Sequence, residues 1–349
     1  MKTSGIQGRM QSMRIKSRQR GIGLVEIMIS LVLGLLVTGA IVQIYLTTKR
    51  QNDMQTSLTG RQESARFAAQ LIQRDAQMAG FRGCLRDRGT VVNTLNNANN
   101  FLYNYGQHVV GFDNAGGLPG SILSVVPDTD VLTLRTLDDP GIVLAANMLD
   151  SSANPVTAVG LVPAPLADDD IALVADCSGA TVFQVDKYNA ATGAIEHVAA
   201  GTPGNSTLNL GRVFRAGAQV FRMRSTTYYI RESAAGTGPA LWRRVGLEPA
   251  QELAEGIENM QVLYGEDVDA NQTPDFYRTA DAVTDWTRVV SLQVALLAAG
   301  LQERVADADL RTFDLLGEVV DPTAGGTLPS DGRLRRVLTF TVAMRNRVS

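Results

Sequence analysis

Acidic and amide side chains alternate in one short stretch of the chain, where they could bind a metal ion. Four oxygen-bearing residues match the first, third, fifth and ninth positions of a calcium-binding loop: Asp267, Asp269, Asn271 and Asp275. Calcium prefers such oxygen ligands, and a tight turn can bring several of them together. The sixth position, which needs glycine, is Gln272, and the twelfth, which needs a bidentate glutamate, is Arg278. We therefore expect an acidic, solvated hairpin loop, with calcium binding as the alternative.

Residues suited to catalysis are scarce in this sequence. The 349 residues include only two histidines, His108 and His197, and two cysteines, which leaves little material for a zinc site or an iron–sulfur cluster. The sequence contains no phosphate-binding G-x-x-x-x-G-K-[ST] loop, no G-x-S-x-G elbow and no H-E-x-x-H motif. Neither histidine lies in a motif that pairs it with a nucleophile. We expect no enzymatic activity and, calcium apart, no cofactor.

The arginines are the next candidates, because they could bind nucleic acid or a partner protein. Two groups precede or occupy expected strands: Arg212, Arg215, Arg222 and Arg224, then Arg333, Arg335 and Arg336. Strand alternation places Arg222 and Arg224 on one face of a sheet. Without the first 21 residues, 26 basic and 35 acidic side chains remain, a difference of −9. Such an acidic body disfavours binding to phosphate backbones, so we expect a solvated sheet face and no nucleic-acid binding.

The N-terminus combines a basic leader with a long apolar segment. Residues 1–21 contain six basic side chains and no acidic one, and residues 22–46 carry a single charge, Glu26. As a helix these 25 residues span roughly 37 Å, enough to cross a bilayer core of about 30 Å. The basic flank predicts a cytoplasmic leader and an exported body. A cleaved secretory signal or a plain signal anchor are the alternatives, although secretory signals have shorter apolar regions.

The junction around Gly21 resembles the class III leader of type IV prepilins and type II secretion pseudopilins. The order is Gln19-Arg20-Gly21, then Ile22-Gly23-Leu24-Val25-Glu26, followed by the apolar run. The resemblance implies that a prepilin peptidase cleaves after Gly21 and methylates the new N-terminal residue, Ile22. It also makes Glu26 the fifth residue of the mature chain. The leader is longer than usual for the family, so Met1, Met10 and Met13 all remain candidate start residues.

Glu26 also has a physical reason to be functional. A carboxylate in hydrocarbon costs on the order of 2.5–3.5 kcal/mol, so such residues are usually paired. In a filament of packed helices, Glu26 could lie beside the positive N-terminal amine of a neighbouring subunit. That pairing would offset desolvation and set the axial register of the subunits. An interfacial glutamate without a role is the alternative.

Beyond the apolar segment, residues 47–80 predict an amphipathic helix that packs on a domain. Apolar residues follow a helical spacing of four and three at Ala65, Ala69, Ile72, Ala76 and Ala79. Gly60 predicts a bend and Gly80 a helix end. From residue 81 onward the pattern changes to short β-like runs: 122–126, 131–134, 171–175, 181–185, 218–223, 227–231, 241–245, 260–264, 289–298 and 336–345. Long coils are expected over 90–120 and 138–168, and a weak domain division near 202–206.

The sequence therefore predicts an α+β fold, in which a long N-terminal helix packs on a β-rich, mainly antiparallel domain. Its expected parts are a cleaved leader (1–21), a transmembrane helix (22–46), an amphipathic helix (47–80) and a periplasmic β-rich domain (81–349). In an oxidising periplasm Cys84 and Cys177 are expected to form a disulfide. It would close a loop of roughly 94 residues and contribute up to about 4.6 kcal/mol. Two separate buried thiols are the alternative.

Three further segments resemble the family of PilW-type minor pilins: residues 79–84 (AGFRGC), 256–265 (GIENMQVLYG) and 335–347 (RRVLTFTVAMRNR). Residues 90–210 carry no motif that we can assign. The resemblance implies a subunit that helps prime type IV pilus assembly, and thereby twitching motility, adhesion or competence. Its implied partners are minor and major pilins, the prepilin peptidase and the inner-membrane assembly platform. The alternatives are a type II secretion pseudopilin and a single-anchor periplasmic binding or adhesin module.

Overall fold

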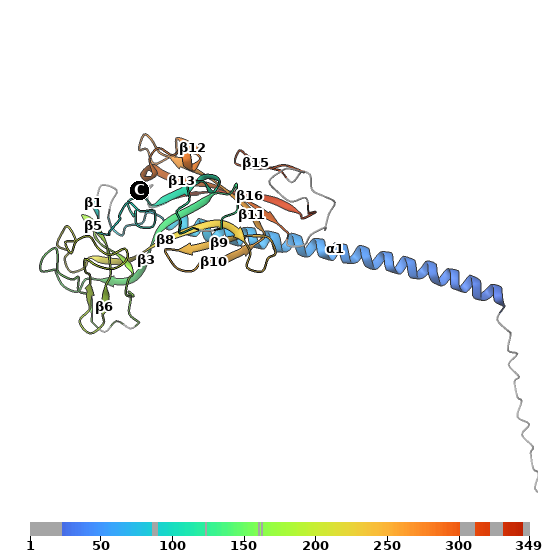
Figure 1. Cartoon of the computed structure of the whole chain (residues 1–349), viewed down its shortest axis with the longest axis horizontal. Helices are drawn as coiled ribbons and strands as arrows, with labels where there is room; N and C mark the ends of the chain where they lie inside the picture. The colour runs from blue at the N-terminus through green and yellow to red at the C-terminus, as the bar shows by residue number, and fades with distance from the viewer. Residues whose placement is uncertain are drawn as a thin grey trace, which may run out of the picture. The chain divides into compact units, whose positions relative to one another are not determined.

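The computed structural model describes residues 23–85, 90–122, 124–159, 161, 163–300, 311–321 and 331–344. The chain divides into two compact units, Met1–Asn52 and Asp53–Ser349 (Figure 1). One helix, α1 (Leu24–Met78), begins in the first unit and ends in the second. All the described strands belong to the second unit, so the fold is α+β with a long N-terminal helix and a β-rich body, as predicted.

The second part of α1 is a helix because small and apolar residues recur at helical spacing and face the body. Ala65, Ala69, Ile72, Ala76 and Ala79 are all buried, which confirms the predicted stripe. The helix ends at Met78, and Gly80 follows with a φ of 77°, a conformation that glycine adopts without a Cβ clash. The Gly80 N–H donates to the Arg135 carbonyl, 3.3 Å away. α1 continues through Gly60, where the sequence predicts a weak point or bend, so the helix does not end there.

The body contains one large and one smaller sheet. The eight-stranded sheet has the order β1-β5-β4-β8-β3-β2, and β9 and β10 continue from β8 (Figure 1). The four-stranded sheet has the order β12-β11-β13-β16. Neighbouring strands are antiparallel except for β1 and β5. The strands of the large sheet are β1 (Thr90–Asn93), β2 (Val109–Phe112), β3 (Val131–Val143), β4 (Ile171–Asp176), β5 (Gly179–Gln184), β8 (Gln219–Glu232), β9 (Pro239–Val245) and β10 (Gln251–Glu255).

The remaining elements complete the smaller sheet and the loops around it. The smaller sheet contains β11 (Ile257–Glu266), β12 (Phe276–Arg278), β13 (Val289–Ala299) and β16 (Arg335–Ala343). Two hairpins stand apart from both sheets: β6 (Lys187–Asn189) with β7 (Ala194–Glu196), and β14 (Phe313–Leu315) with β15 (Glu318–Val320). Three short 3₁₀ helices are η1 (Asp113–Ala115), η2 (Ala280–Ala282) and η3 (Trp286–Arg288).

The main core lies where α1 meets both sheets. The alanine stripe and Ile72 of α1 share one apolar cluster with Leu132 and Ile230 of the large sheet and Val262 and Leu296 of the small sheet. Alanine has the smallest apolar side chain, so the helix backbone approaches the strands closely. Burying a side chain such as Ile72 contributes roughly 1.5–3 kcal/mol relative to leaving it exposed. This packing fixes the second part of the helix to the body.

Most of the predicted strands are present, and the exceptions have physical explanations. The described residues of the range 122–126 form no strand, because the chain turns at Ser124, whose φ is 59°. The runs 218–223 and 227–231 merge into β8, which passes through the polar residues between them. The expected coil over 90–120 contains two four-residue strands, β1 and β2, too short to give a clear alternation. No division occurs near 202–206, since residues 53–349 form one compact unit.

Candidate functional site

The expected processing site, Gly21 and Ile22, lies outside the described residues. Glu26 is described and lies in the first turn of α1, where its carboxylate is exposed and the helix dipole favours a negative charge. The apolar residues that follow it are exposed along the helix, for example Leu31 at 62% and Leu36 at 65%. By length and composition α1 is able to cross a membrane. An apolar surface of this length requires a bilayer or partner helices.

A polar contact joins α1 to the large sheet near the end of the helix. The hydroxyl of Tyr228, on β8, donates to the Asp75 carboxylate at 2.6 Å. Burial raises the pKa of Tyr228 far above its usual value of 10, and the neighbouring Asp75 charge raises it further. The phenol therefore stays protonated as a donor throughout the physiological range. The contact fixes the rotation of α1 on the body.

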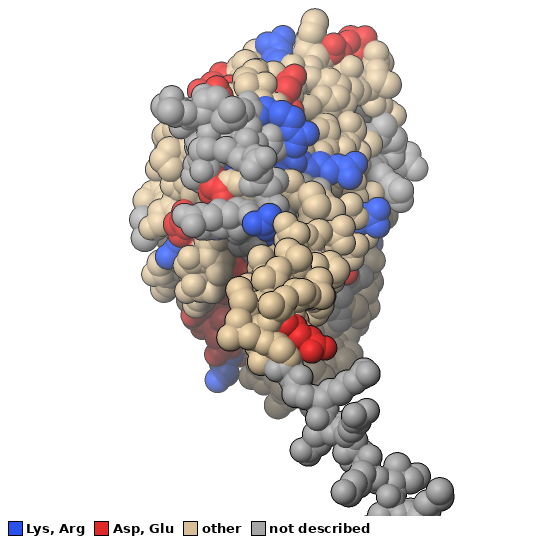
Figure 2. Space-filling model, turned by 90° about the vertical axis from the view of Figure 1, so that its right-hand side faces the viewer, with Lys and Arg blue, Asp and Glu red and all other residues tan. Residues whose placement is uncertain are grey.

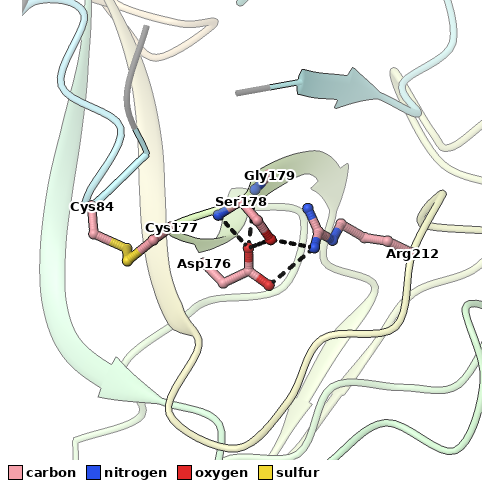
Figure 3. The surroundings of a disulfide bond; sticks show 6 residues. All are labelled: Cys84, Asp176, Cys177, Ser178, Gly179 and Arg212. Atoms are coloured by element: carbon pink, nitrogen blue, oxygen red, sulfur yellow. Dashed lines mark hydrogen bonds and ion pairs between the residues drawn. A yellow bond between two sulfur atoms is a disulfide. The ribbon is translucent and has the colours of Figure 1, made fainter. Parts of the chain in front are cut away.

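Cys84 and Cys177 form the predicted disulfide, which joins the segment after α1 to the turn between β4 and β5 (Figure 3). The residues beside Cys177 hold that turn in place. The Asp176 carboxylate accepts from the Ser178 and Gly179 N–H groups at 2.8 and 3.0 Å and pairs with Arg212 at 3.3 Å. Although burial opposes it, these donors and the Arg212 charge hold the pKa of Asp176 below its usual value.

The acidic loop, residues 267–275, brings together three of the four candidate calcium ligands. Carboxylate oxygens of Asp267, Asp269 and Asp275 lie within 4.8 Å of one another. Backbone N–H groups of the loop already donate to these carboxylates: those of residues 271 and 272 to Asp267, that of residue 271 to Asp269 and that of residue 268 to Asp275. The Oδ1 atom of Asn271 accepts from the Thr273 N–H at 2.8 Å. The loop is thus held by its own hydrogen bonds.

The two positions that depart from the calcium pattern behave differently. Gln272 adopts a φ of 72°, the conformation for which the pattern uses glycine. Arg278, at the twelfth position, lies 3.6 Å from the Glu266 carboxylate and stacks over the Phe276 ring. It therefore supplies a cation where the pattern needs a carboxylate.

Most arginines of the two groups seen in the sequence are neutralised by acids. Arg222 and Arg224 do lie on one face, and both contact Asp138, at 2.9 and 3.0 Å. Arg212 pairs with Asp176, Arg333 with Asp331, and Arg335 with Glu258 and Asp331. On the face drawn in Figure 2, basic side chains gather in one stretch across the upper middle, and acidic side chains lie around it.

Sequence reasoning missed a buried ion pair in the small sheet. Arg335 binds Glu258 through two hydrogen bonds, Nε to Oε2 at 2.6 Å and Nη2 to Oε1 at 3.0 Å. Both side chains are almost fully buried, at 1% and 2% exposed. Burial raises the pKa of Glu258, and the Arg335 charge opposes that shift. The partners are 77 positions apart in the sequence with no spacing signal, so only the fold brings them together.

A second missed cluster surrounds Asp130, which precedes β3. Its Oδ1 accepts from the Asn114 N–H at 2.9 Å and its Oδ2 from the Val262 N–H at 2.8 Å. A side-chain hydrogen bond also joins it to Asp113. Burial raises the pKa of Asp130 to about 7, and Asp113 contributes to that shift. The buried hydroxyl of Tyr264, near both acids, has no hydrogen-bond partner among the residues that the structure describes.

The histidines lie apart, and each contacts a backbone carbonyl. His108 Nε2 is 2.7 Å from the Val289 oxygen, and His197 Nε2 is 2.9 Å from the Leu208 oxygen. Both side chains are buried. Each histidine is therefore held in place by a backbone group.

Comparison with protein families agrees with this geometry. Residues 227–346, from β8 to β16, match the family of type IV pilus-assembly protein W. Residues 16–42, the end of the leader and the apolar helix, match the prokaryotic N-terminal methylation motif. The chain matches a PilW-type, pilin-like protein. No curated protein and no solved structure matches it at a significant level.

A PilW-type protein is a structural subunit associated with a type IV pilus, which agrees with the features described above. The methylation motif and the apolar helix indicate single-pass membrane anchoring. The first match includes β11, which carries Glu258, β16, which carries Arg335, and β13, which lies between them. These strands pack against α1. The disulfide, the helix and the leader motif together fit a membrane-anchored, pilin-like protein.

Proposed function

We propose that this protein is a minor pilin that helps prime type IV pilus assembly, and thereby supports twitching motility, adhesion or competence. The observation that carries the proposal is α1 itself. Its first part exposes an apolar surface with one acid in the first turn, and its second part is packed into a β-rich body by an alanine stripe. Such a subunit can enter a helical bundle through the first part while the body remains outside it. Its function is association, not catalysis.

The proposal assigns roles to the N-terminal residues. The prepilin peptidase cuts between Gly21 and Ile22 and methylates Ile22. The precursor spans the inner membrane once through residues 22–46, and residues 47–80 join that segment to a periplasmic domain, 81–349. Glu26 pairs with the N-terminal amine of a neighbouring subunit and sets the register. The partners are minor and major pilins and the assembly platform of the inner membrane.

Complementation of a deletion strain tests these roles. We expect Gly21→Val to retain its leader and to restore no surface pili, because the peptidase requires a small residue at the junction. We expect Glu26→Ala to be cleaved and methylated normally but to assemble poorly. Mass spectrometry of the N-terminus and shearing of surface pili measure the two steps separately. Normal pili together with shortened, methylated protein from the Gly21 variant would contradict the proposal.

A further inference from the structure

Two arginines on the α1 side of the small sheet have no acidic partner. Arg336, on β16, and Arg66, on α1, are both exposed, and neither forms a hydrogen bond or an ion pair with a residue that the structure describes. The two arginines that precede Arg336 in the sequence behave differently, since Arg333 and Arg335 are both paired with acids. A structural role within the chain therefore accounts for Arg333 and Arg335 but leaves Arg66 and Arg336 unexplained.

Arg66 and Arg336 line the same pocket. The pocket has a volume of about 150 Å³ and lies between α1 and the edge of the small sheet formed by β13 and β16. Its described lining consists of Gln62, Ala65, Arg66, Ala298, Arg336 and Leu338. Arg336 lies opposite Ala298 in the β13–β16 register, so both side chains are on the same face of the sheet. A water needs roughly 10–15 Å³ of such space, so the pocket can hold a carboxylate with its methylene stem.

The chemistry of this pocket selects an anionic group with an apolar stem. Arginine forms short, bidentate hydrogen bonds with carboxylates, and two arginines can hold one carboxylate from both sides. Ala65, Ala298 and Leu338 would contact the stem. Without an anion, two like charges face one cavity, which is unfavourable. A second pocket, beside the large sheet, differs from this one, because its Arg222 is already paired with Asp138 and Asp170.

We propose that this pocket receives the side chain of an aspartate or glutamate from a neighbouring pilin subunit. The inference rests on the proposed function, since it names the chemistry by which the body recognises its partner. Gln62, Ala65 and Arg66 of α1 line the pocket, so a subunit packed against this part of the helix has access to it. Burial of the partner carboxylate between Arg66 and Arg336 adds charge specificity to contacts that are otherwise apolar.

Site-specific photo-cross-linking in cells tests the proposal on the full chain. A photoreactive amino acid replaces Gln62, at the pocket, and mass spectrometry locates the cross-linked residue. We expect a cross-link to a pilin subunit, next to an acidic residue. Arg336→Glu should lower its yield at least tenfold, and Arg66→Glu should do the same. Arg215→Glu is the matched control, because it makes the same charge change at an exposed, unpartnered arginine and should leave the yield within twofold.

The outcomes separate this proposal from the proposed function. A second photoreactive residue at Val37, in the exposed apolar helix, reports general packing with other pilins. Cross-links to pilins from position 37 but none from position 62 would overturn the pocket alone. Absence of both would overturn the minor-pilin function as well. A cross-link from position 62 to phospholipid, or a yield that both charge reversals leave unchanged, would also contradict the acidic partner.

Discussion

The buried Asp130 should make the stability of the body depend on pH in an unusual direction. A carboxyl normally has a pKa of 3.8, but burial among β3, η1 and β11 raises the pKa of Asp130 to about 7. The folded chain therefore holds a proton that the unfolded chain releases. By linkage, the contribution of Asp130 to the free energy of unfolding is greatest below about pH 4. It falls as the pH rises from 4 to 7 and is constant above that.

The size of this effect follows from the difference between the two pKa values. Each pH unit between 3.8 and about 7 corresponds to about 1.36 kcal/mol, so full ionisation costs the folded state about 4 kcal/mol. Asp130→Asn removes the titration but leaves one of the two backbone N–H donors without its acceptor. That loss costs about 1–3 kcal/mol at every pH. The two effects are separable, because only the first varies with pH.

Urea unfolding of the full chain in detergent, followed by tryptophan fluorescence, measures both the pH-dependent and the pH-independent effect on stability. The ring of Trp286 packs 4.8 Å from that of Tyr264, so it reports on this region. The difference in unfolding free energy between the wild type and Asp130→Asn should change by about 4 kcal/mol from pH 4 to pH 8. Asp128→Asn, at an exposed neighbouring acid, should show no such change. A difference between wild type and Asp130→Asn that stays constant within 1 kcal/mol would refute the reasoning.

Four other predictions concern the contacts that hold the body. Cys84→Ala should lower the free energy of unfolding by about 2–5 kcal/mol, measured by urea unfolding against the wild type with its disulfide intact. Tyr228→Phe should cost about 1.5–3 kcal/mol, because the donor to Asp75 is lost; no change in the unfolding midpoint would contradict the role of this contact. Arg335→Met should cost about 3–5 kcal/mol by leaving Glu258 buried and unpaired, and the double variant with Glu258→Gln should recover much of it. Calorimetry at millimolar calcium should give no binding heat from the acidic loop, and a saturable heat would sink that prediction.

Local patterns in the sequence were sufficient to predict α1 and most of the strands. The alanine stripe around Ile72 has helical spacing, and the run at 289–298 is apolar apart from Ser291 and Gln293, as expected of a largely buried strand. The disulfide was predictable because Cys84 and Cys177 are the only cysteines of the sequence and the leader predicts export of the body. These signals depend on composition and short-range spacing, which the sequence carries directly.

Features that depend on the meeting of distant segments were not predictable. Glu258 and Arg335 lie on strands separated by β13, and Asp113 meets Asp130 only because η1 folds over the start of β3. The arginine groups were visible in the sequence, but their neutralisation by acids such as Asp138 depends on strand register. The same limit applies to the pocket, whose two arginines are separated by most of the chain.

A clean deletion strain with a complemented control tests the central claim most directly. Sheared surface pili and the activity of secreted enzymes are measured in parallel. The minor-pilin account predicts loss of surface pili with normal secretion, and restoration of pili by the complementing gene. Loss of secretion with intact pili would contradict it and would assign the protein to a type II secretion pseudopilus.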